Sequence, residues 1–160
     1  MRLLLIAGLA ACSPYSVATT TPPIAPFGPS PGEAAQVCVV RPSSWAAGVT
    51  FVVHDNQQLV GATRGESYFC YIAAPGHHDI VSDTFDSSDT PGRASIELAP
   101  NQRYWLYQDH DNNFGSITSK LSWIDEREAK AMVASCEYKV VVATPAHEPL
   151  PAHVPFAPAI

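Results

Sequence analysis

Proline limits where this chain can form helices or strands more than any other residue type does. The 160 residues include 15 prolines, and eleven of them fall outside residues 36–143. Because proline fixes φ and has no backbone N–H, proline-rich segments favour extended polyproline II over helix or sheet. We therefore expect one folded domain at residues 36–143. It is flanked by disordered tails at 12–35 and 144–160, and we expect the second tail to be removable without loss of stability.

Between the tails, short runs of β-branched and aromatic residues recur roughly every eight to twelve positions with turn residues between them, which is typical of an all-β sandwich or barrel. A segment of this length is able to bury a core without a metal or cofactor. Bulky residues on both faces of 68–72 and 104–107 favour two packed sheets. Strands are expected at residues 36–41, 49–54, 58–63, 66–72, 77–84, 93–98, 103–108, 116–124 and 137–142.

Local signals mark the turns and one helix. Asp55 and Asn56 tolerate positive φ and predict a tight turn between the second and third strands. We expect Gly61 and Gly76 to adopt backbone conformations that are closed to other residues. Asp125 is a candidate N-cap before an acid-rich first turn and strong helix formers, which predicts one short helix near the C-terminal end of the domain.

The N-terminus has the layout of a secretory signal, with Arg2 followed by an apolar run over residues 3–11 and then Cys12. This run is far shorter than the roughly 20 residues that a membrane-spanning helix needs. Residues 9–12, Leu-Ala-Ala-Cys, resemble the lipobox of bacterial lipoproteins. An ordinary signal peptide cleaved nearby, with Cys12 as a chance thiol, is the alternative.

The lipobox resemblance implies that residues 1–11 are removed and that Cys12 becomes an acylated N-terminus carrying chains such as palmitate. Two or more acyl chains hold a protein stably on a membrane. Ser13 resembles the residue that sends proteobacterial lipoproteins to the outer membrane by default. We expect residues 12–35 to act as a spacer of about 3 Å per residue, which holds the domain several tens of Å from the bilayer.

The expected domain contains several short motifs: Arg-Pro at 41–42, Val-Gly at 60–61, Gly-x-x-Tyr-Phe at 65–69, Pro-Gly-x-His at 75–78 and an aromatic strand at 103–106. Residues 36–124 thereby resemble small bacterial lipoproteins of unknown function and the PEGA type of β-sandwich repeat. The resemblance implies an Ig-like or PEGA-like sandwich in the cell envelope. It implies nothing about activity.

Three cysteines remain once Cys12 is acylated: Cys38, Cys70 and Cys136. An oxidising periplasm favours pairing, so we expect one disulfide and one leftover thiol that is buried and inert. The residues alone leave all three pairings open. No Cys-x-x-Cys motif supports a thioredoxin-like role.

Histidines and acids form the remaining candidate chemistry. His77 and Asp79 share one face of an expected strand and, with His110, form a candidate metal site. Residues 109–115 begin like an EF-hand loop, but Phe114 stands where that loop needs glycine, which favours a hairpin turn. Motifs of hydrolases, phosphate-binding loops and dinucleotide-binding sites are absent from the sequence.

The formal net charge is −6, and the sequence has no basic cluster, which argues against nucleic acid as a partner. We expect a lipid-anchored, non-enzymatic envelope protein without cofactors. It would face the periplasm from the outer membrane and bind another envelope protein or the cell wall. Two alternatives remain: a metal-binding lipoprotein that adds His147 and His153 to the candidate site, and a small hydrolase built around His77, Asp79 and His110.

Overall fold

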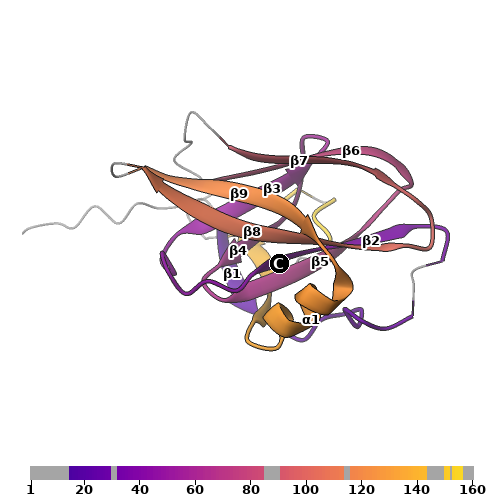
Figure 1. The fold of residues 1–160 in the computed structure, drawn as a ribbon, viewed down its shortest axis with the longest axis horizontal. Helices are drawn as coiled ribbons and strands as arrows, with labels where there is room; N and C mark the ends of the chain where they lie inside the picture. Colours follow the sequence, from indigo (N-terminus) through magenta and orange to yellow (C-terminus); the bar gives the residue numbers. More distant parts are fainter. Residues whose placement is uncertain are drawn as a thin grey trace, which may run out of the picture.

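The computed structural model describes residues 15–29, 32–84, 91–113, 116–143, 150–151 and 153–156. These residues form two packed β-sheets and one short helix (Figure 1), which confirms the all-β sandwich. Strands lie within one or two residues of the expected positions, except that the strand expected at 103–108 continues to Asn113. No helix in the described part of the chain is long and apolar enough to cross a membrane.

The larger sheet has six strands and the smaller has four. In spatial order, the larger sheet contains β1 (Tyr15–Thr19), β10 (Glu137–Ala143), β5 (Ser67–Ala73), β2 (Ala35–Arg41), β8 (Arg103–Asn113) and β9 (Ser116–Ile124). The smaller contains β4 (Gln58–Arg64), β3 (Thr50–Asp55), β6 (Gly76–Thr84) and β7 (Gly92–Leu98). Most neighbouring strands are antiparallel, but β2 and β8 are parallel, and so are β5 and β10.

Strand β2 lies near the middle of the larger sheet, and all seven of its residues are buried. Because side chains alternate along strands, Phe69 and Tyr71 of β5 face the smaller sheet, whereas Cys70 faces outward. The outward face is covered by helix α1 (Glu126–Val133) and by the segment between β1 and β2. In that segment Phe27 stacks on Trp105 with ring centroids 4.8 Å apart. The sheet is therefore covered on both faces at its centre.

Helix α1 begins as its sequence predicts. Asp125 is the N-cap, and its carboxylate accepts a hydrogen bond from the Glu128 backbone N–H at 2.8 Å. The Glu128 side chain accepts one from the Asp125 N–H at 3.2 Å, which completes a capping box. The predicted turn after Asp55 is also confirmed, because Asn56 and Gln57 have φ of 47° and 69°.

The prediction of two disordered tails is wrong for the residues that the structure describes. Tyr15–Thr19 contains no proline and pairs with β10 along its full length, so it covers a sheet edge that would otherwise be open. Leu150 and Val154 pack with Tyr15 and Val17 in a second hydrophobic cluster, whose other members are Val52, Leu59, Ala62 and Val141. The prolines in these segments remove backbone donors, but side-chain burial does not require those donors. Residues 1–14, Cys12 included, and 144–149 lie outside the described residues.

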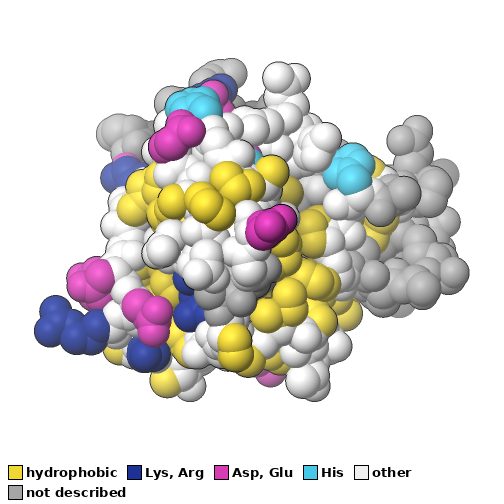
Figure 2. Space-filling model, turned by 90° about the vertical axis from the view of Figure 1, so that its right-hand side faces the viewer, with side chains coloured by type: hydrophobic (Ala, Val, Ile, Leu, Met, Phe, Trp, Pro, Cys, Tyr) yellow, Lys and Arg dark blue, Asp and Glu magenta, His cyan; other side chains and the backbone are white. Residues whose placement is uncertain are grey.

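At the end of the molecule seen in Figure 2, hydrophobic side chains form several exposed patches. Most of the charged side chains on this face gather toward the left of the view. The only large hydrophobic side chain in the described residues that is strongly exposed is Trp45, at 50%.

Gly61 is needed for a different reason from the one that we expected. Its φ is not positive, but a Cβ built on it would lie 2.3 Å from the Phe69 ring, so the side chain of Phe69 occupies the space above the glycine. Gly76 has φ of 130° and does adopt a conformation that other residues avoid.

Candidate functional site

The cysteines form one disulfide, as expected, and the structure selects the pair. Cys38 and Cys70 lie directly opposite each other on β2 and β5, and their sulfur atoms are bonded. Both residues are buried. Cys136 is free and partly buried, and burial raises the pKa of its thiol to about 11. An ordinary nucleophilic cysteine has a lowered pKa, so Cys136 is suited to packing and not to catalysis.

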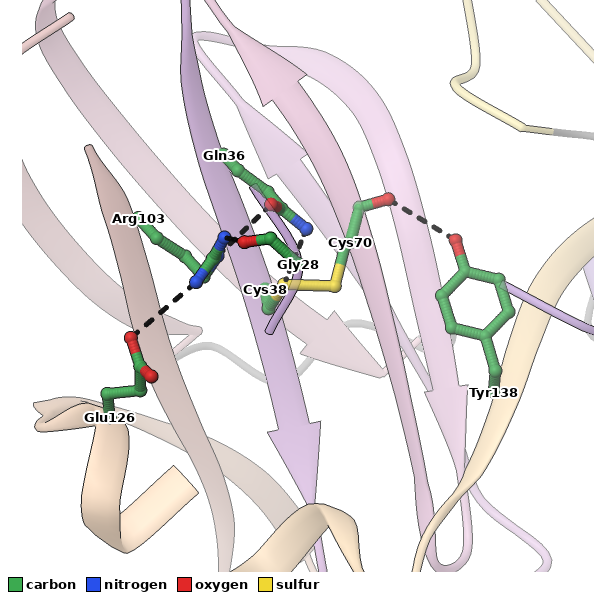
Figure 3. Close-up of a disulfide and its surroundings, with 7 residues drawn as sticks. All are labelled: Gly28, Gln36, Cys38, Cys70, Arg103, Glu126 and Tyr138. Carbon is green, nitrogen blue, oxygen red and sulfur yellow. Dashed lines mark hydrogen bonds and ion pairs between the residues drawn. A yellow bond between two sulfur atoms is a disulfide. The ribbon is translucent and has the colours of Figure 1, made fainter. Parts of the chain in front are cut away.

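A chain of polar contacts surrounds the disulfide (Figure 3). The Gln36 amide donates to Cys38 Sγ at 3.5 Å and accepts from Arg103 Nε at 3.2 Å. The Arg103 guanidinium also donates to the Gly28 carbonyl and lies 3.6 Å from the Glu126 carboxylate. These contacts tie the N-terminal segment and α1 to the disulfide-bonded strands, so their role is structural.

The three residues of the candidate metal site are not brought together. His77 Nε2 lies 3.5 Å from Asp79 Oδ1, and His77 Nδ1 lies 3.7 Å from Glu97 Oε2, on the exposed face of the smaller sheet. The pKa of Asp79 is lowered, mainly by a hydrogen bond from Ser95 and also by His77. His110 belongs to the larger sheet. Among the described residues, no group of three His, Cys, Asp or Glu side chains is placed to hold a metal ion, and His147 lies outside them.

A buried cluster of Asp55, Tyr71 and His78 borders a cavity of about 300 Å³ that Ala74, His153 and Pro155 also line. The His78 Nδ1 atom lies 2.8 Å from both carboxylate oxygens of Asp55. The Tyr71 hydroxyl donates to the same carboxylate at 2.9 Å. Burial, followed by the neighbouring Asp55 carboxylate, raises the pKa of Tyr71 well above its usual value.

This cluster has the composition of a catalytic site, but the ring nitrogens of its histidine already contact protein atoms. His78 Nε2 lies 2.9 Å from the Ala74 carbonyl oxygen, so both ring nitrogens face acceptors. Each ring nitrogen is therefore held by a protein atom, one by the Asp55 carboxylate and the other by the Ala74 carbonyl. A general base needs a ring nitrogen within reach of its substrate, and both nitrogens of His78 already contact protein oxygen atoms in this arrangement. The cluster is therefore better explained as a structural link between β3, β5 and β6.

Arg41 holds the loop formed by residues 42–49. It is fully buried at the end of β2, and its guanidinium donates to the carbonyl oxygens of Trp45, Ala46 and Val49 at 3.1, 3.0 and 2.9 Å. It also lies 4.5 Å above the centre of the Phe51 ring. Burial lowers the pKa of Arg41 to about 10, so the side chain stays charged at neutral pH. The loop is therefore fixed by a charged group beneath it.

On this loop, Trp45 stacks against His110 of β8, with ring centroids 4.6 Å apart and ring planes within 4° of parallel. His110 Nδ1 lies 3.5 Å from the Asp109 carboxylate. Half of the Trp45 surface remains exposed. The sequence analysis did not select Trp45. The signal in the sequence is a tryptophan in a loop that directly follows a buried strand.

These side chains make two candidate sites: a buried aspartate–histidine pair beside a cavity, and an exposed tryptophan on a fixed loop. The resemblance of residues 36–124 to envelope lipoproteins stays a prediction. Comparison of the chain with protein-family models, with curated proteins and with solved structures found no match.

Proposed function

We propose that this chain is a lipid-anchored, non-enzymatic binding protein of the bacterial cell envelope, and that it presents Trp45 to a partner in that envelope. The anchor would be acylated Cys12, as the lipobox-like residues imply. The buried Cys38–Cys70 disulfide supports an exported protein, because disulfides persist in oxidising compartments.

The observation that carries the binding role is the fixed exposure of Trp45. Tryptophan is enriched among the residues that dominate binding energy at protein interfaces. Binding is weakened when a side chain or loop must be ordered first, and a preorganised loop avoids that cost. Three hydrogen bonds from Arg41 and the stack on His110 already hold this loop and its tryptophan in place.

Two observations support a role without catalysis. Both nitrogens of His78 are occupied by Asp55 and Ala74. The rival hydrolase site needs His77 and His110 together, but these residues belong to different sheets. The same separation argues against the metal-binding alternative, because it keeps His110 away from His77 and Asp79.

The proposal is tested by site-specific photocrosslinking in intact envelopes. A photoreactive amino acid replaces Ser44, which is exposed next to Trp45, and the adduct is identified by mass spectrometry. The matched control carries the same group at Ser122, an exposed position on β9. We expect a defined envelope adduct from position 44 only, and an additional Trp45→Ala change should lower its yield about tenfold, the effect of losing roughly 1.4 kcal/mol of binding energy.

An adduct whose yield is unchanged by Trp45→Ala would contradict the proposal. Equal adducts from both positions would also contradict it, because they would indicate contacts without a defined surface. Thermal melting of the Trp45→Ala variant checks that the domain remains folded, as expected for a side chain that is half exposed.

A further inference from the structure

Strand β1 begins much closer to Cys12 than a spacer would allow. Only Ser13 and Pro14 separate Cys12 from Tyr15, the first residue of β1. An extended chain spans at most about 3.6 Å per residue, so the Cα atoms of Cys12 and Tyr15 lie within about 11 Å of each other. The attachment point is therefore next to the folded domain, and not several tens of Å from it.

The strand that follows Cys12 is firmly held. Its five residues pair in register with β10, and the next N–H, from Thr20, donates to the Tyr138 carbonyl at 3.0 Å. Tyr15 and Val17 pack in the second hydrophobic cluster. An anchor joined to this strand cannot swing freely unless β1 leaves the sheet.

We use the name β1 corner for three groups of residues around this strand: 15–19 of β1, 140–143 of β10, and the C-terminal residues 150–151 and 153–156. Contacts of Val17 and Tyr15 with Val141, Leu150 and Val154 join the three groups. None of these residues is Asp, Glu, Lys or Arg, although the whole chain has a net charge of −6. The nearest charged residues on β10 are Lys139 and Glu137, and both lie beside Thr19, at the end of β1 that is farther from Cys12.

An uncharged corner is suited to a lipid surface for two reasons. No Asp, Glu, Lys or Arg side chain of the corner loses its hydration when the corner meets the headgroups, and such a loss is costly. Tyrosine is also enriched at membrane interfaces, where its ring lies among the headgroups, and Tyr15 is only partly buried by the second cluster. A negatively charged surface on the same corner would instead be repelled by anionic lipids.

From the short tether and this chemistry, we propose that the acylated protein docks its β1 corner directly on the bilayer surface, which fixes the orientation of the sandwich. This inference rests on the proposed lipid anchor at Cys12. Strand β9 then lies away from the membrane, because it forms the opposite edge of the six-stranded sheet. Five strand spacings of about 4.8 Å separate the two edges along the sheet.

The test uses the full acylated chain in vesicles of phosphatidylethanolamine and phosphatidylglycerol that contain a lipid with a nitroxide quencher on its headgroup. In a Cys136→Ala background, a fluorophore is attached through Ser16→Cys on β1 or through the matched control Ser122→Cys on β9. We expect the label on β1 to lose most of its fluorescence and the label on β9 to lose little. Inserting a Gly/Ser linker of about twelve residues after Pro14, with a mean reach of about 20 Å, should restore the β1 signal.

Labelled fatty acid incorporation is measured on the same samples, so that the anchor and the docking are tested separately. An acylated, vesicle-bound protein whose Ser16→Cys label is not quenched would overturn the docking and leave the anchor standing. Equal quenching at both positions would also overturn the docking, because it would indicate no fixed orientation. A chain that takes up no fatty acid and does not bind vesicles would overturn both proposals.

Discussion

Loss of the Cys38–Cys70 bond should destabilise the domain by an amount that follows from the loop that it closes. The two cysteines are 32 residues apart in the sequence. In the chain-entropy model, a loop of that length restricts the unfolded state by about 3.7 kcal/mol at 25 °C. The folded state needs little adjustment, because β2 and β5 also pair through seven residues each. We therefore expect the free energy of unfolding to fall by about 3 to 4 kcal/mol, and Tm by roughly 10 to 15 °C.

The assay is urea unfolding of four samples: the oxidised protein, the reduced wild-type protein, the Cys38→Ala/Cys70→Ala variant, and the oxidised Cys136→Ala variant as the control. Cys136 forms no disulfide, so its replacement should change stability by about 1 kcal/mol or less. The reduced wild-type protein distinguishes loss of the bond from loss of buried sulfur atoms, since it retains both sulfurs. A fall of less than about 1 kcal/mol on reduction would refute the reasoning.

Three other predictions follow from packing and burial. Gly61→Ala should destabilise the domain by about 2 to 3 kcal/mol, because the Cβ of the new alanine would meet the Phe69 ring. The control Gly48→Ala should have little effect in the same urea assay, because the space around Gly48 is open. Removing residues 144–160 should destabilise the domain by about 3 kcal/mol, since the buried Val154 is lost together with the partly buried apolar side chains of that segment. Unchanged unfolding of the truncated chain would contradict the packing of this segment on the domain. Because burial raises the pKa of Cys136 to about 11, iodoacetamide at about pH 8 should alkylate it about a hundredfold more slowly in the folded protein than in urea. The rate in the folded protein should rise with pH until the pH passes about 11. Equal rates in the two states would show that the thiol is not shielded.

Much of the secondary structure was predictable because local signals and tertiary structure agree. The run at 67–73 alternates bulky residues and became β5, and Asp125 became an N-cap with the expected partner at Glu128. The turn after Asp55 follows from residues that tolerate positive φ. In each case a few neighbouring residues carry the information.

What was not predictable depends on contacts between distant residues. The residues of β1 resembled part of a linker because prolines follow them, and their role depends on an open edge of β10. Gly61 resembled a turn glycine, but its small size matters only because Phe69 packs above it. No local pattern pairs β2 with β8 in parallel, and this pairing determines which strands form the edges.

The candidate sites show the same limit. The alternation of side chains correctly placed His77 and His78 on opposite faces, but the choice of His110 as a third ligand required a tertiary contact that does not exist. Arg41 appeared in the sequence only as part of an Arg-Pro motif. Its three bonds to loop carbonyls depend on how residues 42–49 fold back over it.

The central claim, an exported protein anchored through Cys12, is tested most directly by intact mass spectrometry of the chain isolated from cell envelopes. Our account predicts a mature chain that begins at Cys12 and carries the added mass of a diacylglycerol group and an amide-linked acyl chain. It also predicts that Cys12→Ala abolishes this mass and releases the protein from the membrane fraction. A chain that retains residues 1–11, or that begins elsewhere without acyl groups, would contradict the account.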